Sequence, residues 1–175
     1  KGIAGTLGMV IARIQIAVKG ARKPSTILHS LSFGANNKAF KPARTKVDWL
    51  SRDPAVVDAY INDPYCGTVF SCGFYLDLLK GLRTVNSKRN IRRIRKDLPI
   101  LVYSGDHDPV GGMGKGVLKV AGDFIDAGIQ NVSVRLYKDG RHESHNEINK
   151  DEVLADVISW IQRIKPSAVT VSTRQ

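Results

Sequence analysis

The sequence is poor in cysteine, in aromatic residues and in long apolar runs. Its two cysteines, Cys66 and Cys72, are too few for a disulfide scaffold and form no four-ligand zinc pattern, so a reducing, cytoplasmic environment is expected. No apolar run approaches the roughly 18 residues of a membrane span. The nearest, residues 9–18, is interrupted by Arg13, which also argues against a signal-peptide core.

Enough apolar residues are present to form a folded core. Of the 175 residues, 42% are hydrophobic, which excludes a disordered polypeptide, and 16 glycines with 7 prolines exclude a low-complexity or collagen-like chain. The length suits one domain of ordinary size. The chain begins with Lys1 and Gly2 and not with a methionine, so we expect it to be part of a longer polypeptide.

The net charge of +11 is concentrated in the first half of the chain. Residues 1–97 contain 18 basic and 6 acidic side chains, a balance of +12, whereas residues 98–175 contain 9 and 10, a balance of −1. The positive charge of the protein is therefore a property of its first half.

The densest basic run covers residues 88–96. Ile91, Ile94 and Leu98 are spaced as on a helix that has one buried stripe and a basic face in solvent. Contact of this face with an anionic surface, such as membrane headgroups, is the alternative interpretation. Specific binding of nucleic acid is not expected, because no aromatic residue is interleaved with these charges.

The second half alternates between strand and helix patterns. Residues 99–103 are continuously apolar, which predicts a strand buried on both faces, and residues 131–137 alternate as a second strand. Helical spacing of apolar residues predicts helices over 117–128 and 149–166. This β-α-β-α order predicts two parallel strands joined by a right-handed crossover.

The first 97 residues are predicted to be mainly helical, with no strand. A helix that ends at Gly20 is marked by Val10, Ile11, Ile14, Ala17 and Val18. A second helix begins at Asp53-Pro54, an N-cap followed by proline in the first turn. The segment 69–82 is apolar on nearly all sides.

Two parallel strands are not a self-sufficient core. Parallel sheets are normally wide and covered on both faces, and the run 99–103 is too apolar for an edge strand. We therefore expect further parallel strands on a segment that precedes Lys1.

Reactive side chains follow both predicted strands. The loop 104–110 carries Asp106 and Asp108, and the loop 139–143 carries His142. Because the carboxyl ends of parallel strands meet at one edge, a carboxylate should lie near an imidazole, which it can orient as a general base. The alternative is that the aspartates form turns and that His142 is a surface residue.

A metal site is a weaker interpretation of the same loops. Its ligands would come from Asp106, His107, Asp108, His142 and His145. The histidines lack the i, i+4 spacing of helical zinc sites, so no metal is expected. His29, alone in the basic half, is expected to be structural or exposed.

Several motifs together resemble the α/β-hydrolase fold, and within it the bacterial lysophospholipase and monoacylglycerol-lipase-like branch of serine aminopeptidase-like hydrolases. Gly105-Asp106-His107-Asp108-Pro109-Val110 and Gly140-Arg141-His142-Glu143 resemble the last two catalytic blocks of that fold. Further matching motifs are Gly114-Lys115-Gly116-Val117, Asn146-Glu147-Ile148-Asn149, Asp48-Trp49-Leu50-Ser51-Arg52-Asp53 and Asp63-Pro64-Tyr65-Cys66-Gly67.

The resemblance implies a fold and a division of the chain. The fold would be the C-terminal part of an α/β hydrolase, in which residues 98–166 form part of the core. Residues 1–97 would be a helical lid, and residues 167–175 are expected to be a polar tail. The N-terminal sheet and the nucleophile elbow would lie outside this chain.

The resemblance also implies roles for individual residues. Asp108, three residues after Gly105, would be the catalytic acid, with Asp106 the weaker candidate, and His142 would be the base. The segment 69–82 would contribute to an acyl-binding groove. Four aromatic residues are candidates for binding substrate there, with a place in the lid core as the alternative: Trp49, Tyr65, Phe70 and Phe74.

The chain departs from the family pattern at the nucleophile. It contains no Gly-x-Ser-x-Gly motif; Ser71 lies in a helical context, and Ser104 precedes the acid loop. The expected parent is a serine hydrolase of lysophospholipids or monoacylglycerols that needs no cofactor. This chain alone is expected to be inactive without its missing N-terminal portion. The alternative function is a non-catalytic basic module that binds an anionic surface, either membrane headgroups or nucleic acid.

Overall fold

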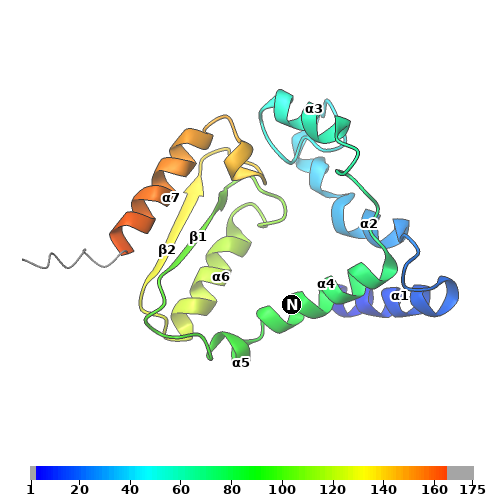
Figure 1. Ribbon diagram of the computed structural model, residues 1–175, viewed down its shortest axis with the longest axis horizontal. Helices are drawn as coiled ribbons and strands as arrows, with labels where there is room; N and C mark the ends of the chain where they lie inside the picture. Colours follow the sequence, from blue (N-terminus) through cyan, green and yellow to red (C-terminus); the bar gives the residue numbers. More distant parts are fainter. Residues whose placement is uncertain (1–2, 165–175) are drawn as a thin grey trace, which may run out of the picture.

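The structure is a computed structural model that describes residues 3–164. Figure 1 shows two regions, with helices α1 to α4 on one side and the strands β1 and β2 with helices α6 and α7 on the other. We call residues 3–97 the helical half and residues 98–164 the sheet half. The predicted polar tail, 167–175, lies outside the described residues.

The helical half contains no strand within its described residues, as the sequence predicts. Its elements are α1 (Ile3–Lys19), α2 (Thr26–Phe33), the 3-10 helix η1 (Asn36–Phe40), α3 (Pro54–Asn62), α4 (Cys72–Val85) and α5 (Lys88–Ile91). The predicted start of α3 is confirmed, because the Asp53 side chain accepts a hydrogen bond from the backbone N–H of Ala55. The predicted end of α1 is confirmed as well, and Gly20 continues the chain with a φ of 94°.

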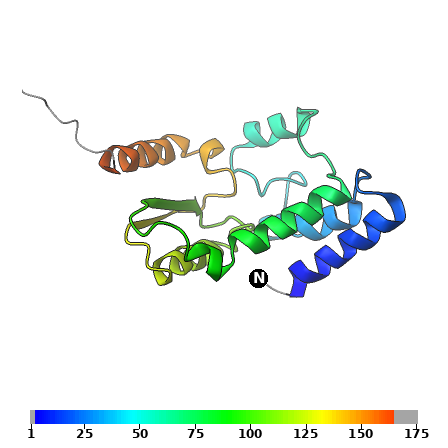
Figure 2. The ribbon, with the colours of Figure 1, turned by 60° about the horizontal axis from the view of Figure 1, so that its bottom comes forward.

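Helix α4 lies along α1, as Figure 2 shows. A small core joins these two helices to α2, through Ala12, Leu28 and Tyr75. Of the apolar stripe predicted for α1, Ile11 packs against this core, whereas Val10 and Val18 are 44% and 81% exposed. The small side chain of Ala12 allows close packing, so the buried face of α1 is the one that carries Met9 and Ala12.

The sheet half has the predicted β-α-β-α order. Its elements are β1 (Ile100–Gly105), α6 (Lys115–Asp126), β2 (Val132–Tyr137), the 3-10 helix η2 (Ser144–Asn146) and α7 (Lys150–Ile164). The strands pair in parallel from Ile100 opposite Val132 to Gly105 opposite Tyr137. Both strands therefore end at the same edge, which carries the two reactive loops.

Strand β1 is not buried on both faces, contrary to the prediction. Its residues 100–103 are only partly buried, because β2 is its sole neighbour among the described residues. The helices around the sheet also leave apolar side chains in solvent, including Leu118 and Ile125 of α6 and Ile158 of α7. None of the described helices is long and apolar enough to cross a membrane.

The basic run does not form the continuous helix that was predicted. Helix α5 covers only Lys88–Ile91, and the chain continues in turns with i to i+3 hydrogen bonds, such as the one from Ile94 N–H to the carbonyl of Ile91. Pro99 disfavours helical backbone at Leu98, which is 40% exposed and not part of a buried stripe. Ile91 is buried, and the basic side chains are exposed.

Candidate active site

The loop after β1 holds a buried carboxylate. Asp108 is 5% exposed, and its carboxylate accepts hydrogen bonds from the backbone N–H of Val110 at 2.8 Å and from the Ser104 hydroxyl at 3.2 Å. These bonds fix the side chain beneath the edge of the sheet. Ser104, which lies in β1 four positions before Asp108, was not predicted from the sequence to make this contact.

The loop after β2 brings an imidazole to that carboxylate. Nδ1 of His142 lies 3.1 Å from Oδ1 and 3.2 Å from Oδ2 of Asp108. The opposite ring nitrogen, Nε2, has no hydrogen-bond partner within residues 3–164, and the side chain of His142 is 36% exposed. A neutral imidazole held in this way donates from Nδ1 and leaves Nε2 free to accept a proton.

The two loops meet because two glycines lie face to face. A Cβ atom on Gly105 would lie 1.9 Å from the carbonyl oxygen of Gly140, which shows that the backbones touch. The same carbonyl accepts a hydrogen bond from the N–H of His107 at 2.9 Å. This contact holds the segment that precedes His142 against the segment that precedes Asp108.

The Asp108–His142 pair shifts both ionisation equilibria in favour of the charged forms. The hydrogen bond with Asp108 raises the pKa of His142 above its usual value of about 6.5, although burial works in the opposite direction. Burial raises the pKa of Asp108, but the hydrogen bond and positive charge of His142, with the bonds from Val110 and Ser104, together outweigh it. The pKa of Asp108 therefore lies below its usual value.

The loop that carries His142 is attached to the helical half through Glu147. This carboxylate is 1% exposed, forms an ion pair with Nε of Arg52 at 2.8 Å, and accepts hydrogen bonds from the backbone N–H groups of Arg52, Arg141 and Ile148. We call this set of bonds the Arg52–Glu147 latch. Both residues belong to motifs that resemble the family, but the resemblance implied no role for either.

Two further backbone hydrogen bonds lie beside the latch. The N–H of Glu143 donates to the carbonyl of Leu50 at 2.8 Å, and the N–H of His142 donates to that of Trp49 at 3.4 Å. The rings of Trp49 and His142 also lie 5.0 Å apart between centroids. The segment around Trp49 therefore forms one wall of the site.

The five residues considered as metal ligands do not gather at one point. Asp108 and His142 pair with each other, Asp106 lies 2.6 Å from His107, and His145 lies 2.7 Å from the hydroxyl of Tyr103. Asp106 and His107 approach Asp139 closely enough that the three could hold an ion. This group is largely exposed, and acidic groups commonly lie this way at surfaces without a metal.

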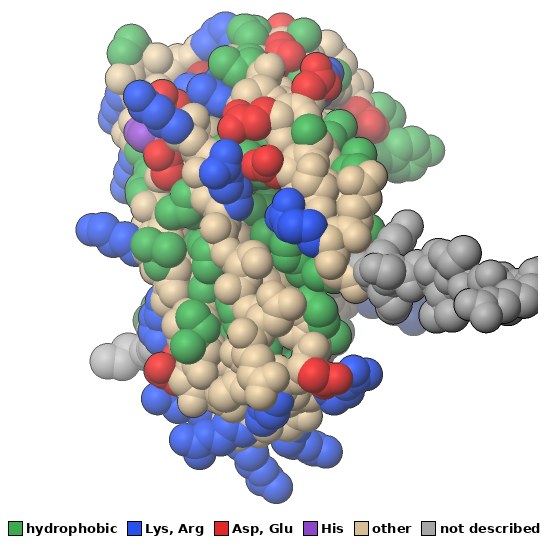
Figure 3. Space-filling view, turned by 90° about the vertical axis from the view of Figure 1, so that its left-hand side faces the viewer, with side chains coloured by type: hydrophobic (Ala, Val, Ile, Leu, Met, Phe, Trp, Pro, Cys, Tyr) green, Lys and Arg blue, Asp and Glu red, His purple; other side chains and the backbone are tan. Residues whose placement is uncertain are grey.

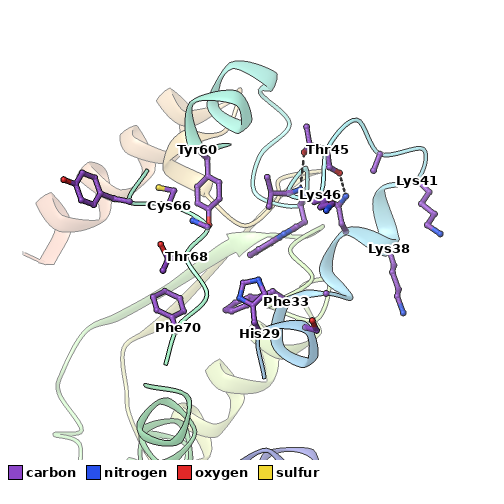
Figure 4. Close-up of a pocket in the computed structure, with 18 residues that line it drawn as sticks. His29, Phe33, Lys38, Lys41, Thr45, Lys46, Tyr60, Cys66, Thr68 and Phe70 are labelled. Atoms are coloured by element: carbon purple, nitrogen blue, oxygen red, sulfur yellow. Dashed lines mark hydrogen bonds between the residues drawn. The ribbon is translucent and has the colours of Figure 1, made fainter. Parts of the chain in front are cut away.

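A cavity of about 760 Å³ opens beside Trp49 in the helical half, and Figure 4 shows its walls. Trp49, Tyr65 and Phe70 line it, as three of the four predicted substrate-binding residues. Phe74 does not line it and stacks on Phe70, with ring centroids 4.1 Å apart. A second cavity of about 410 Å³ lies over Asp108 and His142.

The two strands are parallel, are flanked by helices and carry a carboxylate and an imidazole at their carboxyl edge. This arrangement is part of an α/β-hydrolase fold. The chain matches the model of the family described as serine aminopeptidase, S33, over residues 3–149 and belongs to that family. It is also 33% identical over 117 residues to a monoacylglycerol lipase of Mycolicibacterium smegmatis, in an alignment that covers 65% of this chain and 38% of that protein.

Solved structures show the same fold. A thermostable carboxyl esterase from Bacillus coagulans in complex with glycerol superposes with a TM-score of 0.84 at 24% identity, over 93% of this chain and 53% of that one. A lipase in an open form superposes with a TM-score of 0.79 at 23% identity, over 93% of this chain and 54% of the lipase. A monoglyceride lipase from Saccharomyces cerevisiae with a substrate analogue superposes with a TM-score of 0.57 at 14% identity, over 89% of this chain and 48% of that lipase. The chain thus spans about half of these structures and less of the curated relative.

Proposed function

We propose that this chain supplies the acid and the base of a serine hydrolase that cleaves carboxylic esters of lipid-like substrates, of the lysophospholipid or monoacylglycerol class. The observation that carries the proposal is the contact between His142 Nδ1 and the buried carboxylate of Asp108. Support comes from the family and from relatives that are described as esterases and lipases.

The proposed mechanism gives each atom of the pair one task. Nε2 of His142 accepts the proton of a serine hydroxyl as that oxygen attacks the ester carbonyl, and it then donates the proton to the departing alcohol. A water molecule, activated in the same way by Nε2, then attacks the acyl-enzyme, and the carboxylic acid product leaves as the serine hydroxyl is restored. Asp108 holds the Nδ1–H tautomer and stabilises the imidazolium that forms in between.

The nucleophile of this mechanism is proposed to lie outside the chain. Ser71 is the N-cap of α4, where its side chain accepts a hydrogen bond from the N–H of Phe74 at 3.2 Å, and Ser104 bonds to Asp108. Both serines therefore have other tasks. Without a nucleophile and an oxyanion hole, the 175-residue chain alone is expected to hydrolyse no ester.

The helical half is proposed to be the lid, and the cavity beside Trp49 its acyl-binding site. Aromatic walls bury an acyl chain favourably, at roughly 25 cal/mol per Å² of apolar surface removed from water. Trp49 lines this cavity, and its ring lies 5.0 Å from the imidazole of His142 between centroids. An acyl chain in the cavity would therefore place its ester near the pair.

Hydrolysis of a nitrophenyl ester by the full-length protein tests the proposal. We expect His142→Ala and Asp108→Asn to lower kcat by roughly 10³-fold or more. Asp106→Asn is the matched control, because Asp106 contacts His107 and not His142. Activity of His142→Ala within a few-fold of the parent would refute the mechanism, and so would turnover by the 175-residue chain alone.

A second candidate function, contact with an anionic surface, is supported by the basic run. Lys88, Arg89, Arg92 and Arg93 are exposed and form no ion pair within residues 3–164. Figure 3 shows Lys and Arg side chains gathered at one end of the molecule, the end at which Figure 1 places α5. Binding to anionic vesicles that weakens with salt and is lost on neutralising Arg92 and Arg93 would support this function. Equal binding by that variant would exclude it.

A further inference from the structure

The cavity beside Trp49 has walls of two kinds. One part is aromatic and apolar, and another carries three lysines. The aromatic residues are Phe33, Trp49, Tyr60, Tyr65 and Phe70, and the lysines are Lys38, Lys41 and Lys46. None of the described residues that line the cavity is an aspartate or a glutamate.

The three ammonium groups are not neutralised by the protein. Lys38, Lys41 and Lys46 are exposed, and none forms a hydrogen bond or an ion pair with its side chain in the part of the chain that the structure describes. Their long stems allow the charges to move toward a ligand. A region that carries three positive charges and no negative one attracts anions.

Two acidic residues of the helical half, Asp48 and Asp58, have hydrogen-bond partners other than these lysines. The carboxylate of Asp48 is buried and accepts hydrogen bonds from the backbone N–H groups of Arg44 and Thr45, at 2.6 and 3.0 Å, and from the Thr45 hydroxyl. Asp58 pairs with Nη1 of Arg44 at 2.6 Å. Within the described residues, neither carboxylate forms an ion pair with any of the three lysines.

Two of the lysines and part of the apolar wall lie on different sides of the cavity. Figure 4 shows Lys38 and Lys41 together on the side of η1 and the loop after it, whereas Cys66 and Phe70 lie across from them. A ligand that fills the cavity would meet apolar rings on one side and positive charge on the other. An amphiphile with a negatively charged head fits this division.

We propose that this cavity binds an acyl amphiphile with a phosphate head group, whose apolar chain packs against the aromatic wall and whose phosphate lies among Lys38, Lys41 and Lys46. The inference deepens the proposed function and rests on it for the fate of the ester. The ammonium group of lysine is a compact charge that suits phosphate oxygens. Within the lysophospholipid and monoacylglycerol classes, the lysines favour the substrate that carries phosphate.

Calorimetric binding to the full-length protein tests the proposal without hydrolysis. The probes are dodecyl phosphate, the neutral 1-O-dodecylglycerol and inorganic phosphate, and none of them contains a carboxylic ester. We expect dodecyl phosphate to bind roughly tenfold or more tightly than the neutral probe, a preference that falls with rising salt. Because His142→Ala would retain this binding, a failure of the proposed hydrolysis and a failure of the phosphate site are distinguishable.

Two triple variants isolate the lysines. Lys38→Gln with Lys41→Gln and Lys46→Gln should bring the two dodecyl probes to within about twofold of each other. The control, Lys80→Gln with Lys115→Gln and Lys150→Gln, removes the same charge at positions that do not line the cavity and should keep the preference. Equal binding of both probes to the parent, or a preference that survives the first triple variant, would overturn the proposal. Inorganic phosphate that binds as tightly as dodecyl phosphate would also overturn it, because free phosphate would then be the ligand.

Discussion

Nε of Arg52 donates a hydrogen bond to Oε2 of Glu147 at 2.8 Å, across a sequence separation of 95 residues. The ion pair joins the helical half to the loop that carries His142, and Glu147 is almost completely buried. The same carboxylate accepts a hydrogen bond from the backbone N–H of Arg141, the residue directly before His142. The position of the imidazole therefore depends on a contact with the helical half.

Glu147→Gln is expected to destabilise the full-length protein strongly. Loss of the Glu147 charge leaves the guanidinium of Arg52, whose side chain is 22% exposed, without its ion-pair partner, and we expect this to cost about 1.5–3 kcal/mol of unfolding free energy. The control is Glu152→Gln, because Glu152 and Arg135 form an exposed pair at 3.5 Å. We expect the control to cost about 0–1 kcal/mol. Urea denaturation measures the unfolding free energy of both variants. Equal losses would show that the Arg52–Glu147 latch stabilises the fold no more than an exposed ion pair does.

The pKa of His142 is expected to depend on Asp108. The imidazole should titrate above about 6.5 in an NMR experiment, and Asp108→Asn should lower its midpoint, because the carboxylate that favours the imidazolium is lost. Asp106→Asn should leave that midpoint unchanged. A midpoint that does not fall in Asp108→Asn would contradict the pairing.

The same shifts predict how stability changes with pH. The raised pKa of His142 stabilises the folded state below the unfolded value of about 6.5, and this contribution is lost as pH rises through the folded pKa. The lowered pKa of Asp108 stabilises the folded state above about 3.9, and this contribution is lost as pH falls through the folded pKa. The contribution of the pair is thus greatest between about pH 4 and 6.5, and Asp108→Asn should flatten the profile in urea titrations.

Ser104→Ala is expected to lower kcat/KM for ester hydrolysis about threefold to tenfold, because the hydroxyl that donates to the buried Asp108 is lost. Ser104→Thr, which keeps a hydroxyl, should restore much of the activity. Loss of the donor should also raise the pKa of Asp108. Full activity of Ser104→Ala would show that the bond does not help to position the carboxylate.

Ser71→Ala is expected to affect stability and not catalysis. Loss of the N-cap of α4 should cost about 1 kcal/mol of unfolding free energy. Ser71→Asp keeps a capping oxygen and should recover most of this loss. Both variants should hydrolyse esters at the parental rate, and inactivity of both would identify Ser71 as the nucleophile instead.

The strand order and the two reactive loops were predictable, because they depend on local patterns. The apolar run 99–103, the alternation over 131–137 and Gly128 after α6 each reflect a short-range preference. Together they place the loops of Asp108 and His142 at one edge. The resemblance to the hydrolase family then distinguished Asp108 from Asp106. In the structure, Asp108 contacts His142, whereas Asp106 contacts His107.

The packing faces and the latch were not predictable, because they depend on contacts between distant segments. The apolar stripe of α1 with Val10 and Val18 looks like a buried face in sequence, yet the helix buries Ala12, whose small side chain allows α4 to approach. Nothing near Glu147 in sequence indicates that its partner is Arg52. Such long-range pairs are visible only once the fold is formed.

The contact between Gly105 and Gly140 sets the spacing of the two loops. A methyl group at position 105 would overlap the carbonyl of Gly140, so even alanine would force the two strand ends apart. Its effect would reach Asp108 and His142 by separating them, although it would touch neither. Because Gly105 has no Cβ atom, the two strand ends can approach closely enough for the imidazole of His142 to contact the carboxylate of Asp108.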